Sequence, residues 1–128
     1  MISQHIALLV GAAFGMFAVI FGAFGAHALK KVLNSKQLKG FETGIKYQMY
    51  HALALLFTGS YFSNTSLHQW MYTSFIAGTV LFSFSIYGLV ISDAKGKKFR
   101  FLGPITPLGG LLLIVGWGLL FYNLITTF

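Results

Sequence analysis

The chain has 128 residues, of which 56% are hydrophobic and only 9% are charged. A soluble domain normally has about 25% charged residues, so this composition excludes an ordinary water-exposed globular domain and indicates a membrane protein. The length suits a single domain covering residues 1–128. Cysteine is absent, which excludes disulfides, thiolate catalysis and cysteine-based metal sites.

The first apolar segment covers residues 4–28, which is long enough for a hydrocarbon core that takes roughly 20 helical residues to cross. No basic side chain precedes Lys30, so we expect a retained helix rather than a cleaved signal peptide. Small residues recur in it every three or four positions: Gly11, Gly15, Ala18, Gly22 and Ala26. Such a stripe allows close helix packing, either within the chain or between two copies.

Residues 30–46 form a polar connection with five lysines, part of which we expect to lie along the membrane interface as a short amphipathic piece. The second predicted span covers residues 44–62. An uncharged turn follows, and the third predicted span covers residues 69–92.

The second basic loop covers residues 93–100, and the fourth predicted span covers residues 102–125. This span begins with the sequence LGPITPLGG. Pro104 suits a first helical turn, whereas Pro107 is expected to cost a backbone hydrogen bond and to make the start of the span irregular.

The charge distribution predicts the topology. The loop before the second span has five lysines, the loop before the fourth has three lysines and Arg100, and the loop between the second and third spans has no charge. Basic loops stay in the cytoplasm. We therefore predict an all-α, polytopic four-transmembrane-helix bundle, N-out/C-out. A three-span alternative, with the short second segment at the interface, would put the basic loops on opposite sides.

This topology brings polar residues from all four helices to the cytoplasmic half of the bundle. We take them as the candidate ligand-binding pocket: His27, Glu42, Gln48, His51, Ser83, Ser85, Tyr87 and Thr106. The basic residues of the two loops are candidates for contact with anionic headgroups: Lys30, Lys31, Lys46, Lys97, Lys98 and Arg100.

The histidines have a structural and a functional interpretation. His51 can hydrogen-bond a neighbouring helix, and His27 can meet a helix C-terminus or a headgroup phosphate. Alternatively the two converge and bind a metal ion, a proton or an anionic headgroup. Glu42 is the one carboxylate near them, so we expect no metal site. Ser83 and Ser85 lack the context of a hydrolase nucleophile, and we expect no catalytic residue and no cofactor.

Four blocks of sequence resemble the DUF423 family of small bacterial membrane proteins, which is related to the transmembrane protein 256 group. They are GAFGAHALKK (22–31), FETGIKYQMYHALALL (41–56), GTVLFSFSIYGL (78–89) and LGPITPLGGLLLIVGW (102–117). The chain departs from the family pattern FSGS by having Phe84 where the family usually has Gly. The resemblance implies the membrane fold and its topology, and the family has no established function.

We therefore expect a non-enzymatic component of the bacterial plasma membrane that binds lipid or another membrane protein, or assembles with copies of itself. A small oligomeric transporter or channel and an enzyme at the membrane interface are the alternatives. Nucleic acid is not an expected partner, because the basic residues lie in two short clusters between apolar segments.

Overall fold

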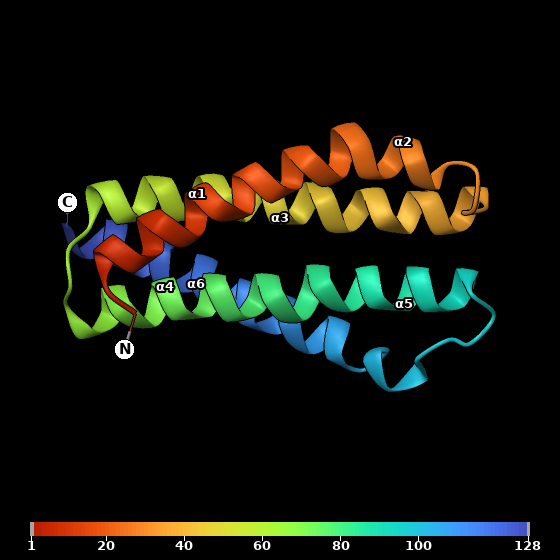
Figure 1. The fold of residues 1–128 in the computed structure, drawn as a ribbon. Helices are drawn as coiled ribbons and strands as arrows, with labels where there is room; N and C mark the ends of the chain where they lie inside the picture. The colour runs from red at the N-terminus through yellow and green to blue at the C-terminus, as the bar shows by residue number, and fades with distance from the viewer. Residues whose placement is uncertain (1, 128) are drawn as a thin grey trace.

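The computed structural model describes residues 2–127, which are helical apart from short connections and contain no strand. The described residues form four long helical segments, called rods below, each antiparallel to the next in the chain (Figure 1). In chain order the elements are α1 (Gln4–Ile20), a π turn (Phe21–Gly25), α2 (Ala26–Leu29), α3 (Ser35–Tyr61), α4 (Ser66–Thr79), a second π turn (Val80–Phe84), α5 (Ser85–Ala94), a 3-10 turn (Arg100–Leu102) and α6 (Ile105–Thr127).

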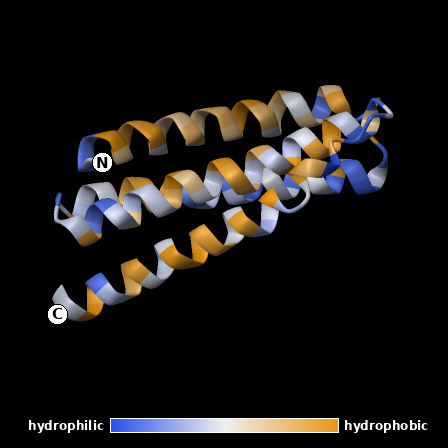
Figure 2. Cartoon of the chain, turned by 90° about the horizontal axis from the view of Figure 1, so that it is seen from below, coloured by the Kyte–Doolittle hydropathy of each residue, from blue (hydrophilic) through white to orange (hydrophobic). Residues whose placement is uncertain are grey.

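Three of the four rods are long and apolar enough to cross a membrane: Gln4–Leu29, Ser66–Ala94 and Arg100–Thr127. The protein is therefore a helical membrane protein. Both basic connections lie at one end of the bundle, and the turn between α3 and α4 lies at the other end with both termini (Figure 1). Hydrophilic residues gather at the end with the basic connections (Figure 2).

α1, α3 and α4 begin at side-chain caps. Ser3 accepts a hydrogen bond from the amide of Ile6, and Thr65 accepts one from the amide of His68. At α3, Asn34 and Gln37 form a reciprocal capping box with hydrogen bonds of 2.8 and 3.0 Å. Most of the expected 30–46 connection is therefore the first three turns of α3 rather than a separate interfacial piece.

Pro107 does not break the fourth rod, contrary to the expectation from sequence. α6 begins at Ile105, so Pro107 is its third residue. The first four amides of an α-helix have no intrahelical acceptor, and the missing N–H of Pro107 costs nothing there.

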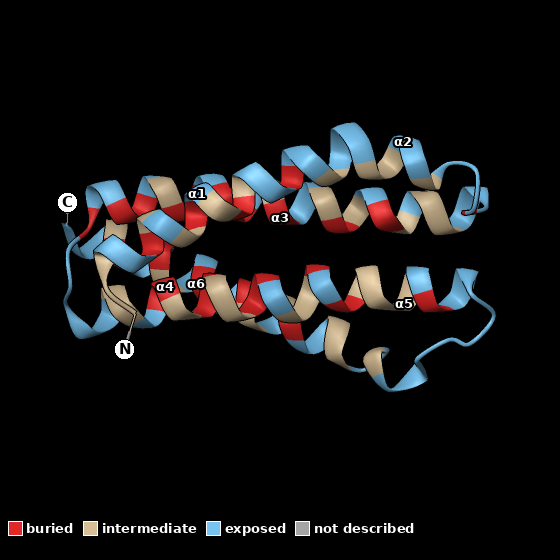
Figure 3. Ribbon diagram, viewed as in Figure 1, coloured by how far each residue is buried: buried red, intermediate tan, exposed pale blue. Residues whose placement is uncertain are grey.

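The helices pack as two pairs. α1 lies along α3, α6 lies along α4 and the second π turn, and α3 joins the pairs through α4 and α5. α1 and α6 thus lie at opposite edges of the molecule (Figure 2). Buried residues line the faces where the rods meet, and exposed residues cover the outside (Figure 3). The fully buried centre includes Leu55, Met71, Tyr72 and Phe75.

Glycines set the distance between paired helices. A methyl group at Gly109 of α6 would lie 2.8 Å from the carbonyl carbon of Leu81 and 2.9 Å from the carbonyl oxygen of Gly78. A methyl group at Gly11 of α1 would lie 3.0 Å from the Cβ of Leu55. The predicted stripe on the first helix therefore packs within the chain at Gly11.

The two π turns face the same point of α3. A Cβ at Gly22 would contact Ile45 at 3.6 Å, and the Ser83 hydroxyl donates a 2.8 Å hydrogen bond to the carbonyl of Gly44. A π turn contains one more residue than an α turn and commonly marks a functional region. The first and third rods thus change their helical phase where they meet α3 at Gly44 and Ile45.

Gly109→Ala should destabilise the protein, because the new methyl group meets backbone atoms that cannot move independently of α4. Overpacking of this kind costs about 1–3 kcal/mol, measurable as a lower melting temperature in detergent. Gly118→Ala is the matched control, since a Cβ there has no neighbour within 4 Å. Equal melting temperatures for the two variants would contradict close packing at Gly109.

Candidate functional site

Gln48, which is buried, and Tyr87, which is half-buried, form a polar pair between three helices. The Tyr87 hydroxyl donates to Oε1 of Gln48 at 2.7 Å, and Nε2 of Gln48 donates to the carbonyl of Phe14 at 2.9 Å. Gln48 has no exposed surface. A Cβ at Gly44 would lie 2.6 Å from the Tyr87 ring, so this glycine makes room for the tyrosine. The pair ties α1, α3 and α5 together.

The aromatic surroundings of Tyr87 complete this cluster. Its ring lies 5.5 Å from that of Phe21, 5.2 Å from that of Phe41 and 5.8 Å from that of Phe84, measured between centroids. Phe84, the departure from the family pattern, therefore packs beside Tyr87 on the outside of the cluster and is exposed.

The two predicted serines form hydrogen bonds to neighbouring helices, Ser83 to a backbone carbonyl and Ser85 to a side chain. The Ser83 hydroxyl donates to the carbonyl of Gly44, as described above, and joins the third rod to α3. The Ser85 and Thr106 hydroxyls lie 2.6 Å apart and join α5 to α6. These hydroxyls hold helices together in the way expected of serine and threonine in an apolar environment.

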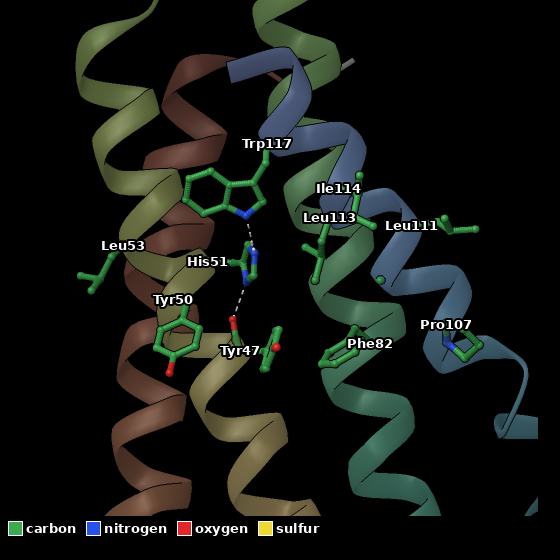
Figure 4. Close-up of a pocket in the computed structure, with 11 residues that line it drawn as sticks. Tyr47, Tyr50, His51, Leu53, Phe82, Pro107, Leu111, Leu113, Ile114 and Trp117 are labelled. Carbon is green, nitrogen blue, oxygen red and sulfur yellow. Dashed lines mark hydrogen bonds between the residues drawn. The ribbon is translucent and has the colours of Figure 1, made fainter. Parts of the chain in front are cut away.

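His51 bridges α3 and α6. Its Nδ1 lies 2.6 Å from the carbonyl oxygen of Tyr47, and the indole Nε1 of Trp117 donates to its Nε2 at 3.0 Å (Figure 4). An indole nitrogen can only donate, so Nε2 is the acceptor and the proton of the neutral ring lies on Nδ1, which donates to Tyr47. Both ring nitrogens are therefore occupied.

Two predicted members lie away from these clusters. His27 and Glu42 are exposed. Gly25, at the end of the first π turn, packs against Phe41 of α3, so His27 is level with the beginning of α3. That level is about twelve residues from His51 on α3, or roughly 18 Å along the helix axis. The two histidines do not converge, and among residues 2–127 no three His, Asp or Glu side chains are grouped so that they could hold a metal ion.

A groove of about 940 Å³ lies between α3 and α6. It exists because α6 packs on α4 rather than on α3. The aromatic and polar residues that border it are Tyr47, Tyr50, His51, Phe82 and Trp117, with Pro107 and aliphatic residues of α6 opposite (Figure 4). Tyr47 and Tyr50 are 39% and 52% exposed.

Sequence reasoning included His51 and missed Trp117, its partner across the groove. A signal for it was available. Trp is typical of the membrane interface, whereas Trp117 lies near the middle of the predicted span 102–125. An indole N–H at that depth needs an acceptor, and a histidine on a neighbouring helix can supply one.

Known proteins resemble the chain along most of its length. The family described as "Protein of unknown function (DUF423)" matches residues 21–110. A UPF0382 membrane protein of Staphylococcus saprophyticus is 42% identical over 111 residues, which cover 86% of this chain and 88% of the relative. One of Schizosaccharomyces pombe is 37% identical over 115 residues, covering 84% and 92%. No solved structure matches the chain.

The Gln48–Tyr87 pair should behave as one energetic unit. Tyr87→Phe leaves Oε1 of Gln48 buried without its donor, which costs about 1–3 kcal/mol. The double variant Gln48→Leu/Tyr87→Phe should lose less free energy of unfolding than the two single variants lose together. The difference, which is the coupling energy, should be about 0.6–1.7 kcal/mol, as for other hydrogen bonds in membranes.

Unfolding of the two single variants and the double variant in mixed detergent measures this coupling. Tyr122→Phe, at a tyrosine that is 51% exposed, is the control and should leave stability unchanged. Strictly additive effects of Gln48→Leu and Tyr87→Phe would show that the pair contributes no coupling.

Proposed function

The chain belongs to the DUF423 family of membrane proteins, and on this basis we propose that it is a non-enzymatic, four-span component of the bacterial plasma membrane that binds lipid in the groove between α3 and α6. The observation that carries the proposal is the groove itself. Its apolar walls and the two exposed tyrosines at its border suit a long apolar chain with one polar end.

The fourth span in this proposal is α3, which is less apolar than the other rods because it contains lysines in its first turns and Gln48 and His51 further along. Its contacts support a spanning position. Gly11 of α1 packs against Ala52 and Leu55, and Gly25 packs against Phe41. A helix that lies along the length of an apolar spanning helix shares its depth, and its two polar side chains are hydrogen-bonded inside the protein.

The orientation in this proposal follows from the basic residues. All nine Lys and Arg residues lie in the two connections at one end of the bundle or within the first twelve residues of α3, which begins at that end. Cytoplasmic loops and helix ends carry an excess of such residues. Both termini and the turn between α3 and α4 are then outside, which is the N-out/C-out topology.

An acyl chain is the proposed occupant of the groove. Ligand pockets typically measure about 300–1,000 Å³ and are lined by apolar side chains with a few polar groups, and this groove has both properties. It opens sideways between two spanning helices, where acyl chains are the surrounding solvent. An ester or acid oxygen at the end of the chain can accept a hydrogen bond from Tyr47 or Tyr50.

The state of the polar groups favours a binding role over chemistry. The Nε2 of His51 accepts from Trp117, and the hydroxyls of Ser83 and Ser85 are engaged with Gly44 and Thr106. No buried side-chain nitrogen or oxygen among residues 2–127 lacks a hydrogen-bond partner. Because these polar groups are engaged in hydrogen bonds that hold the helices together, they support a structural role around the groove rather than a catalytic one.

Labelling of single cysteines should reveal the topology, because the natural chain has no cysteine. An impermeant maleimide applied to intact cells should label Ser66→Cys. Lys36→Cys and Lys98→Cys should react only after the membrane is permeabilised. Different accessibility of the Lys36 and Lys98 positions would instead support three spans.

Filling the groove should abolish lipid binding in it. A Cβ at Gly110 lies 3.8 Å from the Phe82 ring, so Gly110→Leu extends into the groove without a clash. In bilayers with a photoactivatable phospholipid, its cross-linking to the residues of α3 and α6 that line the groove should fall several-fold.

Gly118→Leu is the matched control, because it adds the same side chain to the same helix at a position outside the groove with no neighbour within 4 Å. Its cross-linking should equal that of the natural chain. Cross-links distributed evenly over the outer surface of the natural chain, or unchanged in Gly110→Leu, would refute the groove as a lipid site.

A further inference from the structure

A second hollow lies at the basic end of the bundle, away from the groove. It measures about 320 Å³ and is bordered by Gly88, Ile91, Ser92, Lys95, Lys97 and Phe99. Sequence analysis named Lys97 as a headgroup candidate among six basic residues and omitted Lys95. The structure separates these two lysines from the others, because they border a hollow together.

The loop that carries the lysines is folded rather than loose. α5 ends in a Schellman motif, in which the amide of Lys97 donates to the carbonyl of Ser92 at 3.0 Å and the amide of Gly96 donates to that of Asp93 at 3.0 Å. Gly96 has the positive φ of 78° that this motif requires. The hydrogen-bonded backbone therefore fixes the positions from which the Lys95 and Lys97 side chains extend.

A further hydrogen bond closes the loop. The amide of Phe99 donates to the Ser92 hydroxyl at 3.0 Å, and that hydroxyl donates to the carbonyl of Leu89 at 3.1 Å. Ser92 is 6% exposed. The bond brings the Phe99 ring back to the hollow as one of its walls.

The nearest carboxylate is engaged elsewhere. Asp93 accepts a 2.9 Å hydrogen bond from Nε2 of Gln37 on α3. The motif also satisfies two of the last carbonyls of α5, which would otherwise attract the lysines. Anion binding at Lys95 and Lys97 is thus favoured by the net charge of +7 and faces little competition from nearby acceptors.

The polarity of the hollow changes along the bundle axis. Gly88 and Ile91 lie toward the middle of the third rod, and Lys95, Lys97 and Phe99 lie toward its end. A neighbouring hollow of about 280 Å³ shares Ile91 and Lys95 with this one, and its other lining residues are apolar and include Leu29 at the end of α2. Lys95 thus stands between two hollows with apolar interiors, an arrangement that matches a phosphate above acyl chains.

We propose that this hollow binds the phosphate of an anionic phospholipid, with Lys95 and Lys97 as its cationic donors and Ile91 and Phe99 against the first carbons of the lipid. The site is independent of the groove between α3 and α6. The two cavities share no lining residue, and the groove is proposed to bind an acyl chain whereas this hollow is proposed to bind a phosphate.

The test compares two pairs of lysines. Lys95→Gln/Lys97→Gln and Lys30→Gln/Lys31→Gln remove the same charge at the same end of the bundle, but only the first pair borders the hollow. Binding of phosphatidylglycerol and phosphatidylcholine to each purified variant is measured by native mass spectrometry. Because a lysine near an anionic lipid contributes roughly a fivefold change in affinity, the first pair should lose tenfold or more in phosphatidylglycerol affinity, and the second pair should lose little.

Three further arms complete the experiment. Ser92→Ala keeps both lysines but releases the amide of Phe99, and it should also weaken phosphatidylglycerol binding. Gly110→Leu should leave that binding unchanged, so failure at the groove and failure at this hollow are distinguishable. Inorganic phosphate should not displace the lipid at equal concentration.

Equal losses in the two lysine pairs would show diffuse attraction to the basic surface and overturn the site. Equal affinity for phosphatidylglycerol and phosphatidylcholine would overturn its preference for an anion. Displacement by inorganic phosphate at equal concentration would show that the hollow takes the free anion and not the lipid.

Discussion

The rule that polar groups in an apolar environment must find their partners inside the protein governs this structure. Backbone amides satisfy the rule by forming helices, and the side chains satisfy it by bridging them. Gln48 hydrogen-bonds both the backbone of α1 and the tyrosine Tyr87 of α5. Ser83 donates to the backbone of α3, and His51 accepts a hydrogen bond from the indole of Trp117 on α6. Each bond links helices far apart in sequence. Since apolar packing alone does not distinguish lipid from protein, these bonds supply much of the specificity of the arrangement.

The close approach of α6 to α4 at glycines accompanies the separation of α6 from α3. Gly78 and Gly109 bring α6 onto α4 at backbone contact, and α6 packs there rather than along α3. The remaining gap is the groove, which is crossed at one point by the hydrogen bond between His51 and Trp117. A symmetric bundle with equal spacing would have no such opening.

Sequence patterns predicted the helical membrane fold, because long apolar segments have few alternatives. They also selected Gln48, His51 and Ser83 as candidate site residues, and the structure buries all three. The pattern Asn34–Gln37 also marks where α3 starts, although the lysines that follow suggested a connection. Sequence could not separate His27 and Glu42 from the other polar residues, because their exclusion depends on the level at which α1 and α3 meet. The position of Pro107 within the first turn likewise depends on where α6 begins.

The paired π turns have a consequence for comparisons between relatives. One extra residue shifts the pattern of positions on a helix face by roughly 100°, and a π turn accommodates that residue locally. The first and third rods each contain such a turn where they face Gly44 and Ile45. The sequence spacing of the residues that face α3 therefore changes by one position across each turn, and a relative without the extra residue would need a one-residue gap there to keep equivalent faces aligned. Alignments of this family should be anchored separately on each side of the two turns.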